Sequence, residues 1–394
     1  MASDVPSISP QNASPIRPAF RRIRRTLIND PIQVILYAAG GIFLLLLLLS
    51  AINTITSEGF VLSQYIRRLT FGLAQGSIYA LVALGYTLVY GILGMINFAH
   101  GEVFMAGAYI GFFAAYGMVE AGWLQTVPLL VLLITLLVGM GASVVVAVLL
   151  ERIAYRPLRS APRLVPLITA IGASIFIQQL FLRLFGGSPR VYPDLYLNVP
   201  GTRGECEIVN DVQTCVPVDL IAGIYDVRFL GLELTIRPLV FIIFFLALAL
   251  MGGLWLIVKR TKIGKAMRAV AEDKNTASLM GVNVDRVIVT TFVLGAALAG
   301  AAGVLFALYD GRATPGMGFT FGIKAFTAAV LGGIGNIPGA MAGGVFLGVI
   351  ESVAPALLGI PQQLEDIVAF GMLVLILIFR PTGIFGEVLA KKKA

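Results

Sequence analysis

The sequence predicts an all-α fold: a polytopic transmembrane helical bundle of about ten spans with an internal pseudo-repeat. Apolar runs of about 20 residues, long enough to cross a bilayer as helices, recur along the whole chain. Of the 394 residues, 58% are hydrophobic and 13% are charged, which is about half the charged fraction of a typical soluble domain. Basic residues lie between the apolar runs, a pattern that orients a membrane protein and does not indicate a nucleic-acid partner.

The first 70 residues precede the main bundle. Residues 1–31 are rich in Pro, Ser and Asn and then in Arg, which predicts a disordered basic cytoplasmic tail. Residues 32–70 are expected to form an extra N-terminal span, at 32–52, and an external connector. The apolar run is longer than a signal-peptide core and has no clean cleavage site, so we expect this span to be retained.

The main transmembrane domain is expected at residues 71–386, followed by a basic cytoplasmic tail at 387–394. The positive-inside rule makes the Arg-rich loop 151–163 and the basic segment 259–286 cytoplasmic, and the long polar loop 186–236 external. An even number of spans then places both termini in the cytoplasm. The expected spans of this domain are residues 72–93, 103–117, 126–150, 164–185, 238–258, 287–309, 319–335, 338–358 and 364–379.

The external loop contains both cysteines, Cys206 and Cys215. In an oxidising compartment they are able to form a disulfide that closes a small loop. Two unpaired thiols are the alternative, and the sequence does not decide between the two.

A polar stretch interrupts the apolar pattern early in the domain. Asn97, His100 and Glu102 fall within six residues and are surrounded by glycines. Polar groups at membrane depth are costly, so they usually face a protein interior or a water-filled path. A similar but less polar interruption occurs later in the chain, where Gly333 and Asn336 have the same spacing as Gly94 and Asn97. Paired interruptions of this kind point to a transport site between two repeats.

The breaks, together with three further polar residues near the expected path, yield seven candidate residues for a translocation pathway. Asn97 and Asn336 are the favoured pair, whereas His100 is better explained by hydrogen bonds that join helix ends. Tyr86 is equally well explained as an interfacial anchor. The full set is Gln75, Tyr86, Asn97, His100, Glu102, Lys324 and Asn336. Elsewhere, Gly295, Ala299 and Gly303 recur at four-residue spacing, which favours close helix packing over a substrate-lining face.

The basic segment 259–286 is predicted to form a short amphipathic helix parallel to the membrane. Met267, Val270 and Ala271 share one face, and Gly281 is a natural C-terminal stop. Such a helix is suited to dock into a groove on a soluble partner. On periodicity alone, a basic loop that only orients the protein is an equal alternative.

Catalytic and cofactor sites are not expected. One His cannot build a multi-histidine metal site, and the two Cys do not have zinc-site or redox-motif spacing. No Gly-x-x-x-x-Gly-Lys-[Ser/Thr] motif occurs, so any energy from ATP must come from another subunit. The prediction is therefore no catalytic residue, no metal site and no cofactor bound by this chain.

Several stretches resemble the permease subunits of branched-chain amino acid ABC transporters, and in particular the first of the two permeases that pair in such importers. They are residues 86–102 (YTLVYGILGMINFAHGE), 151–159 (ERIAYRPLR), 268–273 (RAVAED), 324–335 (KAFTAAVLGGIG) and 380–386 (RPTGIFG). The similarity runs from about residue 71 to the end, whereas the first 60 residues depart from the shorter family pattern.

The resemblance implies a heterodimer of two permeases, two cytoplasmic ATPases that use the ATP, and an external solute-binding protein. It also implies that the segment 259–286 couples to an ATPase, although only Ala277 and Gly281 of the Glu-Ala-Ala-x-x-x-Gly coupling motif are kept. The coupling residues expected on this basis are Gly264, Arg268, Glu272, Asp273, Ala277 and Gly281.

The predicted function is that of a permease subunit in the inner (plasma) membrane, surrounded by lipid bilayer, which moves branched-chain or related amino acids inward by alternating access. Other amino acids, amides and urea stay open as cargo. The alternative is an ion-gradient-driven secondary transporter or channel for a small polar solute. That alternative requires buried carboxylates, and Glu102 and Glu351 are the only candidates.

Overall fold

The computed structural model describes residues 52, 56, 62–123, 127–159, 161–162, 164–193, 198–209, 212–219, 225–229, 232–379 and 383–384, and only the backbone between 198 and 236. The predicted tails and nearly all of the predicted first span lie outside these residues. The chain divides into two compact units, residues 1–60 with Leu357–Gly359, and Val61–Ala356 with Ile360–Ala394. The elements below belong to the second unit, apart from the last residue of α13.

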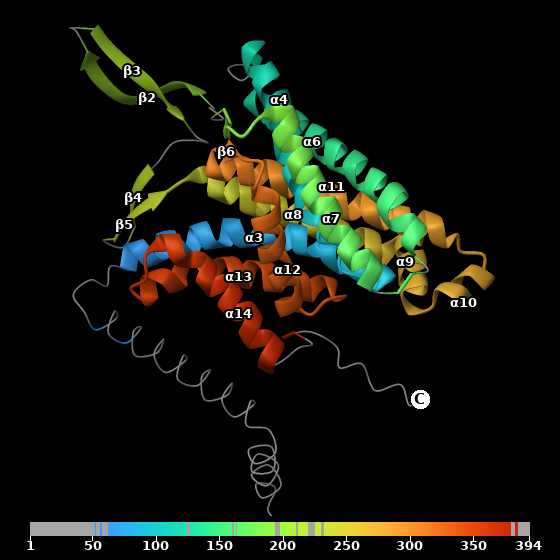
Figure 1. Ribbon diagram of the computed structural model, residues 1–394. Helices are drawn as coiled ribbons and strands as arrows, with labels where there is room; N and C mark the ends of the chain where they lie inside the picture. Colours follow the sequence, from blue (N-terminus) through green and yellow to red (C-terminus); the bar gives the residue numbers. More distant parts are fainter. Residues whose placement is uncertain are drawn as a thin grey trace, which may run out of the picture. The chain divides into compact units, whose positions relative to one another are not determined.

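The second unit is built from helices (Figure 1). The long ones are α3 (Leu62–Leu93), α4 (His100–Glu120), α6 (Pro128–Leu150), α7 (Leu164–Phe185), α8 (Pro238–Arg260), α11 (Val284–Asp310) and α13 (Ile337–Leu357). The shorter ones are α9 (Lys262–Glu272), α10 (Lys274–Leu279), α12 (Met317–Gly332) and α14 (Glu365–Phe379). Seven helices among the described residues are long and apolar enough to cross a membrane. The all-α polytopic bundle is therefore confirmed, whereas the count of about ten spans is not.

Helices α3, α4 and α11 form the centre, and most of their residues are buried. Small residues allow this closeness: a Cβ on Gly107 of α4 would lie 2.6 Å from the Gly300 Cα of α11. At the same crossing, the Ser143 hydroxyl of α6 donates a hydrogen bond to the Val103 carbonyl (2.7 Å). The backbones therefore touch directly, as expected for helices packed in lipid.

The predicted packing role of the small-residue stripe on α11 is confirmed. Ala299 is fully buried. A Cβ on Gly303 would lie 2.2 Å from the Phe104 carbonyl oxygen, and one on Gly295 would lie 3.2 Å from the Gly85 Cα. These residues fill contacts with α3 and α4 and do not line an open path.

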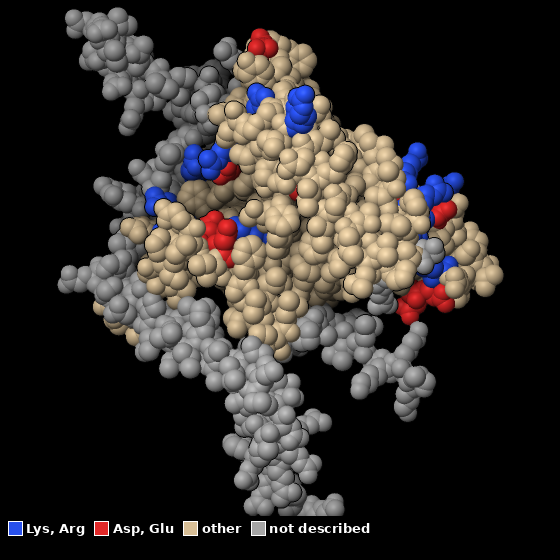
Figure 2. All heavy atoms as spheres, viewed as in Figure 1, with Lys and Arg blue, Asp and Glu red and all other residues tan. Residues whose placement is uncertain are grey.

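Helices α6, α7 and α8 cover this centre and expose large apolar side chains, such as Leu137, Phe176 and Phe245. In Figure 2 the middle of the visible face is correspondingly free of charge, and the charged residues gather toward two opposite ends. This is the surface expected of a protein surrounded by lipid or by other membrane subunits.

Both predicted breaks are present, and each begins with a left-handed glycine. Helix α3 ends before Gly94 (φ 70°), and α12 ends before Gly333 (φ 94°). The Asn336 side chain then accepts a hydrogen bond from the Gly339 amide (3.1 Å) at the start of α13. One expectation is corrected: His100 and Glu102 lie in the first turn of α4, so the first break is confined to residues 94–99.

Short strands occur in the segment 186–236, where the sequence predicted only a polar external loop, and one further strand lies between α11 and α12. They are β1 (Arg190–Val191), which pairs with β6 (Arg312–Ala313), and the two hairpins β2 (Asn198–Val209) with β3 (Val212–Asp219), and β4 (Tyr225–Phe229) with β5 (Leu232–Ile236). In the β2–β3 register Cys206 is directly opposite Cys215. Directly opposite residues have Cα atoms about 4.5–5.5 Å apart, a separation that a disulfide spans. The disulfide stays a prediction with this geometric support.

Candidate functional site

A cavity of about 600 Å³ lies at the N-terminal end of α3. Its wall carries charges of both signs, namely Arg67, Arg68, Asp310, Arg312, Lys324 and Glu365. In Figure 2, blue and red side chains surround a hollow in this part of the surface. Of the seven residues predicted to line a pathway, Gln75 and Lys324 line this cavity.

Lys324 is held in a cluster of carboxylates at this cavity. Its Nζ lies 2.5 Å from a carboxylate oxygen of Glu351, on α13, and 2.5 Å from one of Asp366, on α14. Glu365 is close by, because the three carboxylates have oxygens within 4.8 Å of one another. A buried lysine needs such partners, since an unpaired charge in a low-dielectric interior is strongly disfavoured. Sequence analysis identified Lys324 but missed Asp366, because only the packing of α12 against α14 brings them together.

The inner end of the cavity is closed by aromatic rings packed around Phe321. Its ring centroid is 4.4 Å from that of Phe104 in a stacked arrangement, 4.5 Å from Phe306 and 4.7 Å from Tyr79. Phe104 and Tyr79 are fully buried. This aromatic floor separates the cavity from the polar residues that lie deeper in the bundle.

Tyr86, His100 and Glu102 lie together beyond the floor. The Tyr86 and His100 rings meet edge to face at 5.0 Å. Glu102 is fully buried and accepts a hydrogen bond from the Ser174 hydroxyl (3.0 Å). Within the described part of the chain, His100 Nε2 and Glu102 Oε2 have no hydrogen-bond partner, which is unusual for buried polar atoms. These five candidate residues therefore form two separate groups, Gln75 with Lys324 and Tyr86 with His100 and Glu102.

The two asparagines lie at the other end of α3, near the helix breaks. Asn97 is buried and accepts a hydrogen bond from the Tyr155 hydroxyl (2.5 Å). Tyr155 ends a π-helical turn, Glu151–Tyr155, that continues α6. Such turns are frequent at functional sites. The sequence indicated an Arg-rich loop here, but it did not indicate that Tyr155 at the start of this loop forms a hydrogen bond with Asn97 in the first break.

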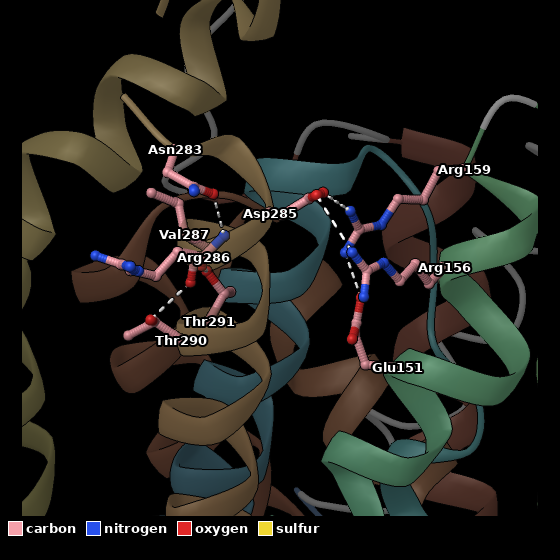
Figure 3. A network of polar contacts seen from close by, with 9 residues as sticks. All are labelled: Glu151, Arg156, Arg159, Asn283, Asp285, Arg286, Val287, Thr290 and Thr291. Atoms are coloured by element: carbon pink, nitrogen blue, oxygen red, sulfur yellow. Dashed lines mark hydrogen bonds and ion pairs between the residues drawn. The ribbon is translucent and has the colours of Figure 1, made fainter. Parts of the chain in front are cut away.

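A charged network joins this turn to the start of α11 (Figure 3). Arg159 donates hydrogen bonds to the buried Glu151 and to Asp285, and Arg156 lies 3.5 Å from Asp285. Partial burial and the positive charge of Arg159 lower the pKa of Lys274, on α10, below its usual range. The network therefore extends electrostatically to the predicted coupling segment. None of these four network residues was predicted as a site.

The segment 259–286, which the sequence predicts to couple to an ATPase and which is called the coupling segment below, forms two helices, α9 and α10, instead of one. Gly264 fits against the end of α8, where a Cβ would lie 2.1 Å from the Val258 carbonyl oxygen, and Arg268 donates to that oxygen. Asp273 caps α10 by accepting from the Asn275 amide (2.8 Å). Met267 and Val270 are buried, as the amphipathic pattern predicted, whereas Ala271, which was predicted on the same face, is exposed. Ala277, on α10, is also buried.

The outer side of the coupling segment is open. Glu272 is exposed, and Gly281 (φ 83°) ends the segment as predicted. Just before it, Leu279 and Met280 are 88% and 80% exposed. Two adjacent apolar side chains that are this exposed at a helix end suit a protein partner. The sequence shows the adjacent Leu279 and Met280, but their hydrophobicity alone predicts that they are buried. Their exposure, and so a candidate partner surface, is visible only in the structure.

The coupling segment also touches the first break. A pocket of about 420 Å³ is lined by residues 270–275 on one side and Gly91–Gly94 on the other. Helix α3 therefore runs from the charged cavity at its start to the coupling segment at its end. A bundle of apolar helices with a charged cavity at one end and an exposed helix pair at the other defines an integral membrane transport protein.

Comparison with known proteins identifies the family. Residues 68–377 match the family described as "Branched-chain amino acid transport system / permease component", and the chain belongs to this family. It is 44% identical to the high-affinity branched-chain amino acid transport system permease protein BraD of Pseudomonas aeruginosa over 329 residues, 82% of this chain and 96% of the relative. It is 42% identical to the permease protein LivH of Escherichia coli over 335 residues, 84% of this chain and 98% of the relative.

A more distant relative is the probable branched-chain amino acid transport permease protein LivH of Methanocaldococcus jannaschii, 26% identical over 275 residues, 69% of this chain and 76% of the relative. No solved structure matches this chain. As a member of this family of ABC-importer permeases, the chain is a transport subunit and not an enzyme. It is a multi-pass protein of the inner membrane and belongs to a system with partner ATPases and a binding protein.

Proposed function

We propose that this chain is one of two different permeases of an ATP-driven importer for branched-chain amino acids. Two cytoplasmic ATPases bind and hydrolyse the ATP, so the chain itself needs no cofactor, and an external solute-binding protein delivers the substrate. The observation that carries the proposal is the identity of 44% and 42%, over more than four fifths of the chain, to permease proteins of high-affinity branched-chain amino acid transport. Similarity of that extent covers the central helices, both breaks and the coupling segment together.

The proposed orientation is supported by the length and contacts of α3. Its 32 residues extend about 48 Å at 1.5 Å per residue, enough to connect the two faces of a membrane. The charged cavity is at its start, and the coupling segment borders its end. If ATPases bind the coupling segment in the cytoplasm, the cavity opens outward. The basic residues near both termini support a cytoplasmic location for them as well. The aromatic floor is then the closed part of an outward-facing pathway, with Tyr86, His100 and Glu102 beyond it.

Coupling is proposed to run through the exposed tip of α10 and the first break. Leu279 and Met280 dock into the ATPase, and their displacement moves the segment that borders Gly94. The contact between Tyr155 and Asn97 attaches the same break to the end of α6. A change at the ATPase therefore has a packed route to the inner end of the pathway.

Reconstitution tests this function. The purified chain, with the second permease, the ATPases and the binding protein, is expected to take up L-leucine into liposomes only when ATP is supplied to the ATPases. Uptake that follows an ion gradient without the ATPases would assign the chain to the secondary transporters instead.

The docking site has its own test. Leu279→Asp is expected to reduce recovery of the ATPases at least about tenfold, because a charge replaces an apolar anchor at the interface centre. Glu120→Gln, at the exposed end of α4, is the control and is expected to retain them. Equal recovery from both variants would place ATPase binding elsewhere.

The orientation is tested by labelling with a membrane-impermeant thiol reagent after Cys206 and Cys215 are replaced by serine. Lys274→Cys is expected to react only from the ATPase side, and Glu120→Cys only from the opposite side. Reaction of both from one side would contradict the proposed topology.

A further inference from the structure

We infer that the charged cavity at the start of α3 is itself a binding site for a hydrophobic amino acid in its zwitterionic form, so that the permease selects substrate in addition to the binding protein. This inference rests on the proposed function and gives the cavity a role in selection. Its volume of about 600 Å³ lies within the range of about 300–1,000 Å³ that is typical of small-molecule sites.

One side of the cavity is suited to an ammonium group. Glu351, Glu365 and Asp366 have oxygens within 4.8 Å of one another, and Lys324 is the one cation bonded within this cluster in the described part of the chain. Three carboxylates this close repel one another, so a second positive charge is favoured there. Glu351 is fully buried and its Oε2 accepts no hydrogen bond from the described residues.

Glu365 is the carboxylate best placed to receive the ligand. It lines the cavity, and its described partner is the neutral Gln362 amide (2.5 Å), not a cation. Lys324 already occupies the space between the other two carboxylates. The cluster thus holds one ammonium group and presents a further carboxylate for a second.

The carboxylate of the ligand would be bound by arginines that also line the cavity. Arg67 is exposed, and its guanidinium has no partner among the described residues. Arg312 pairs with Asp310 through Nε (2.8 Å), which leaves its two terminal nitrogens to receive a ligand. Guanidinium groups suit carboxylates because they donate two parallel hydrogen bonds.

The remaining surface is apolar. Phe71, Phe306, Met317 and Phe321 line the cavity next to the charged groups. A side chain of aliphatic carbon placed against them is removed from water, while the two charges of the ligand face groups of opposite sign.

The charge balance distinguishes this ligand class from others. Four cationic side chains of the wall are matched by two wall carboxylates and by the two that lie behind Lys324. A dianion would leave the carboxylates of the cavity without a ligand charge of opposite sign, and a polyamine would leave the arginines without one. An uncharged sugar or urea would provide no charge for either set. A zwitterion with an apolar side chain uses all three surfaces.

The test measures equilibrium binding of radiolabelled L-leucine to the complete permease–ATPase complex in nanodiscs, without the binding protein. Saturable binding is expected, with competition by L-valine. The probes 3-methylbutylamine and 4-methylpentanoate each lack one of the two charges and are expected to compete at least about tenfold more weakly, because a hydrogen bond between charged groups is lost.

Glu365→Gln and Arg67→Gln are each expected to weaken leucine binding at least about tenfold. Neither side chain is fully buried, so both variants are expected to assemble. Because they remove groups of opposite charge at separate positions, a loss of binding in both variants is not explained by misfolding of one. Glu120→Gln, on an exposed helix end outside the cavity, is the matched control and is expected to bind like the unchanged chain.

Absence of saturable binding, equal binding by the two cavity variants and the control, or equal competition by the singly charged probes would overturn the inference. ATP-driven leucine uptake by the same preparation with its binding protein separates the two claims. Normal uptake without cavity-dependent binding refutes the binding site alone, whereas absence of leucine uptake refutes the proposed function.

Discussion

Gly107 lies where α4, α6 and α11 meet, and replacing it by alanine tests how tightly the bundle is packed. A Cβ at this position would lie 2.6 Å from the Gly300 Cα, 2.7 Å from the Ser143 Oγ and 2.8 Å from the Gly300 carbonyl oxygen. Two of these three atoms belong to the α11 backbone, which moves only if the whole helix moves. Gly107→Ala therefore forces α4 and α11 apart.

The magnitude follows from two opposing effects. Overpacking a close-packed core costs about 1–3 kcal/mol, and contacts this far below van der Waals distance belong at the upper end of that range. The better helix propensity of alanine contributes about 1 kcal/mol in the other direction. We expect a net loss of about 2 kcal/mol for Gly107→Ala, and a larger loss for leucine. Gly141→Ala in α6 is the matched control, because nothing lies within 4 Å of its Cβ position.

The assay compares the temperature at which half of each purified variant stays monodisperse in mild detergent by size-exclusion chromatography. Gly107→Ala is expected to lose stability, whereas Gly141→Ala is expected to be equal to the unchanged chain or slightly more stable. If Gly107→Ala were as stable as the control, the close approach of α4 and α11 would be refuted. An equal loss in both variants would attribute the effect to helix glycines in general.

Two further predictions concern the end of the bundle that carries the segment 259–286. Arg159→Met is expected to lower the same midpoint temperature, because leaving the buried Glu151 without its cation costs about 3–5 kcal/mol. Arg152→Met, at an exposed position, is the control. An equal effect of both variants would contradict the network. Gly264→Ala is expected to displace α9, because its Cβ would lie 2.1 Å from the Val258 carbonyl oxygen. The expected result is a several-fold fall in leucine uptake per ATP hydrolysed, and an unchanged ratio would count against a coupling role for α9.

Local sequence patterns determined the features that depend only on nearby residues. The apolar spans were predictable because a bilayer requires about 20 consecutive apolar residues to satisfy every backbone group within a helix. The breaks at Gly94 and Gly333 were predictable because glycine adopts positive φ without steric cost. The helical form of the segment 259–286 was predictable from the spacing of Met267 and Val270 and from the stop at Gly281.

Only the tertiary structure decided which polar residues share a site. Gln75 and Lys324 line one cavity, Tyr86 and Glu102 lie beyond its aromatic floor, and Asn97 meets Tyr155 at the far end of α3. Hydropathy identifies a span but does not indicate which neighbour each of its faces contacts. That choice depends on contacts between helices far apart in the sequence, such as the direct backbone contact of Gly107 with Gly300. The cluster of Lys324 with Glu351 and Asp366 exists for the same reason: three separate helices, α12, α13 and α14, each contribute one charge to it.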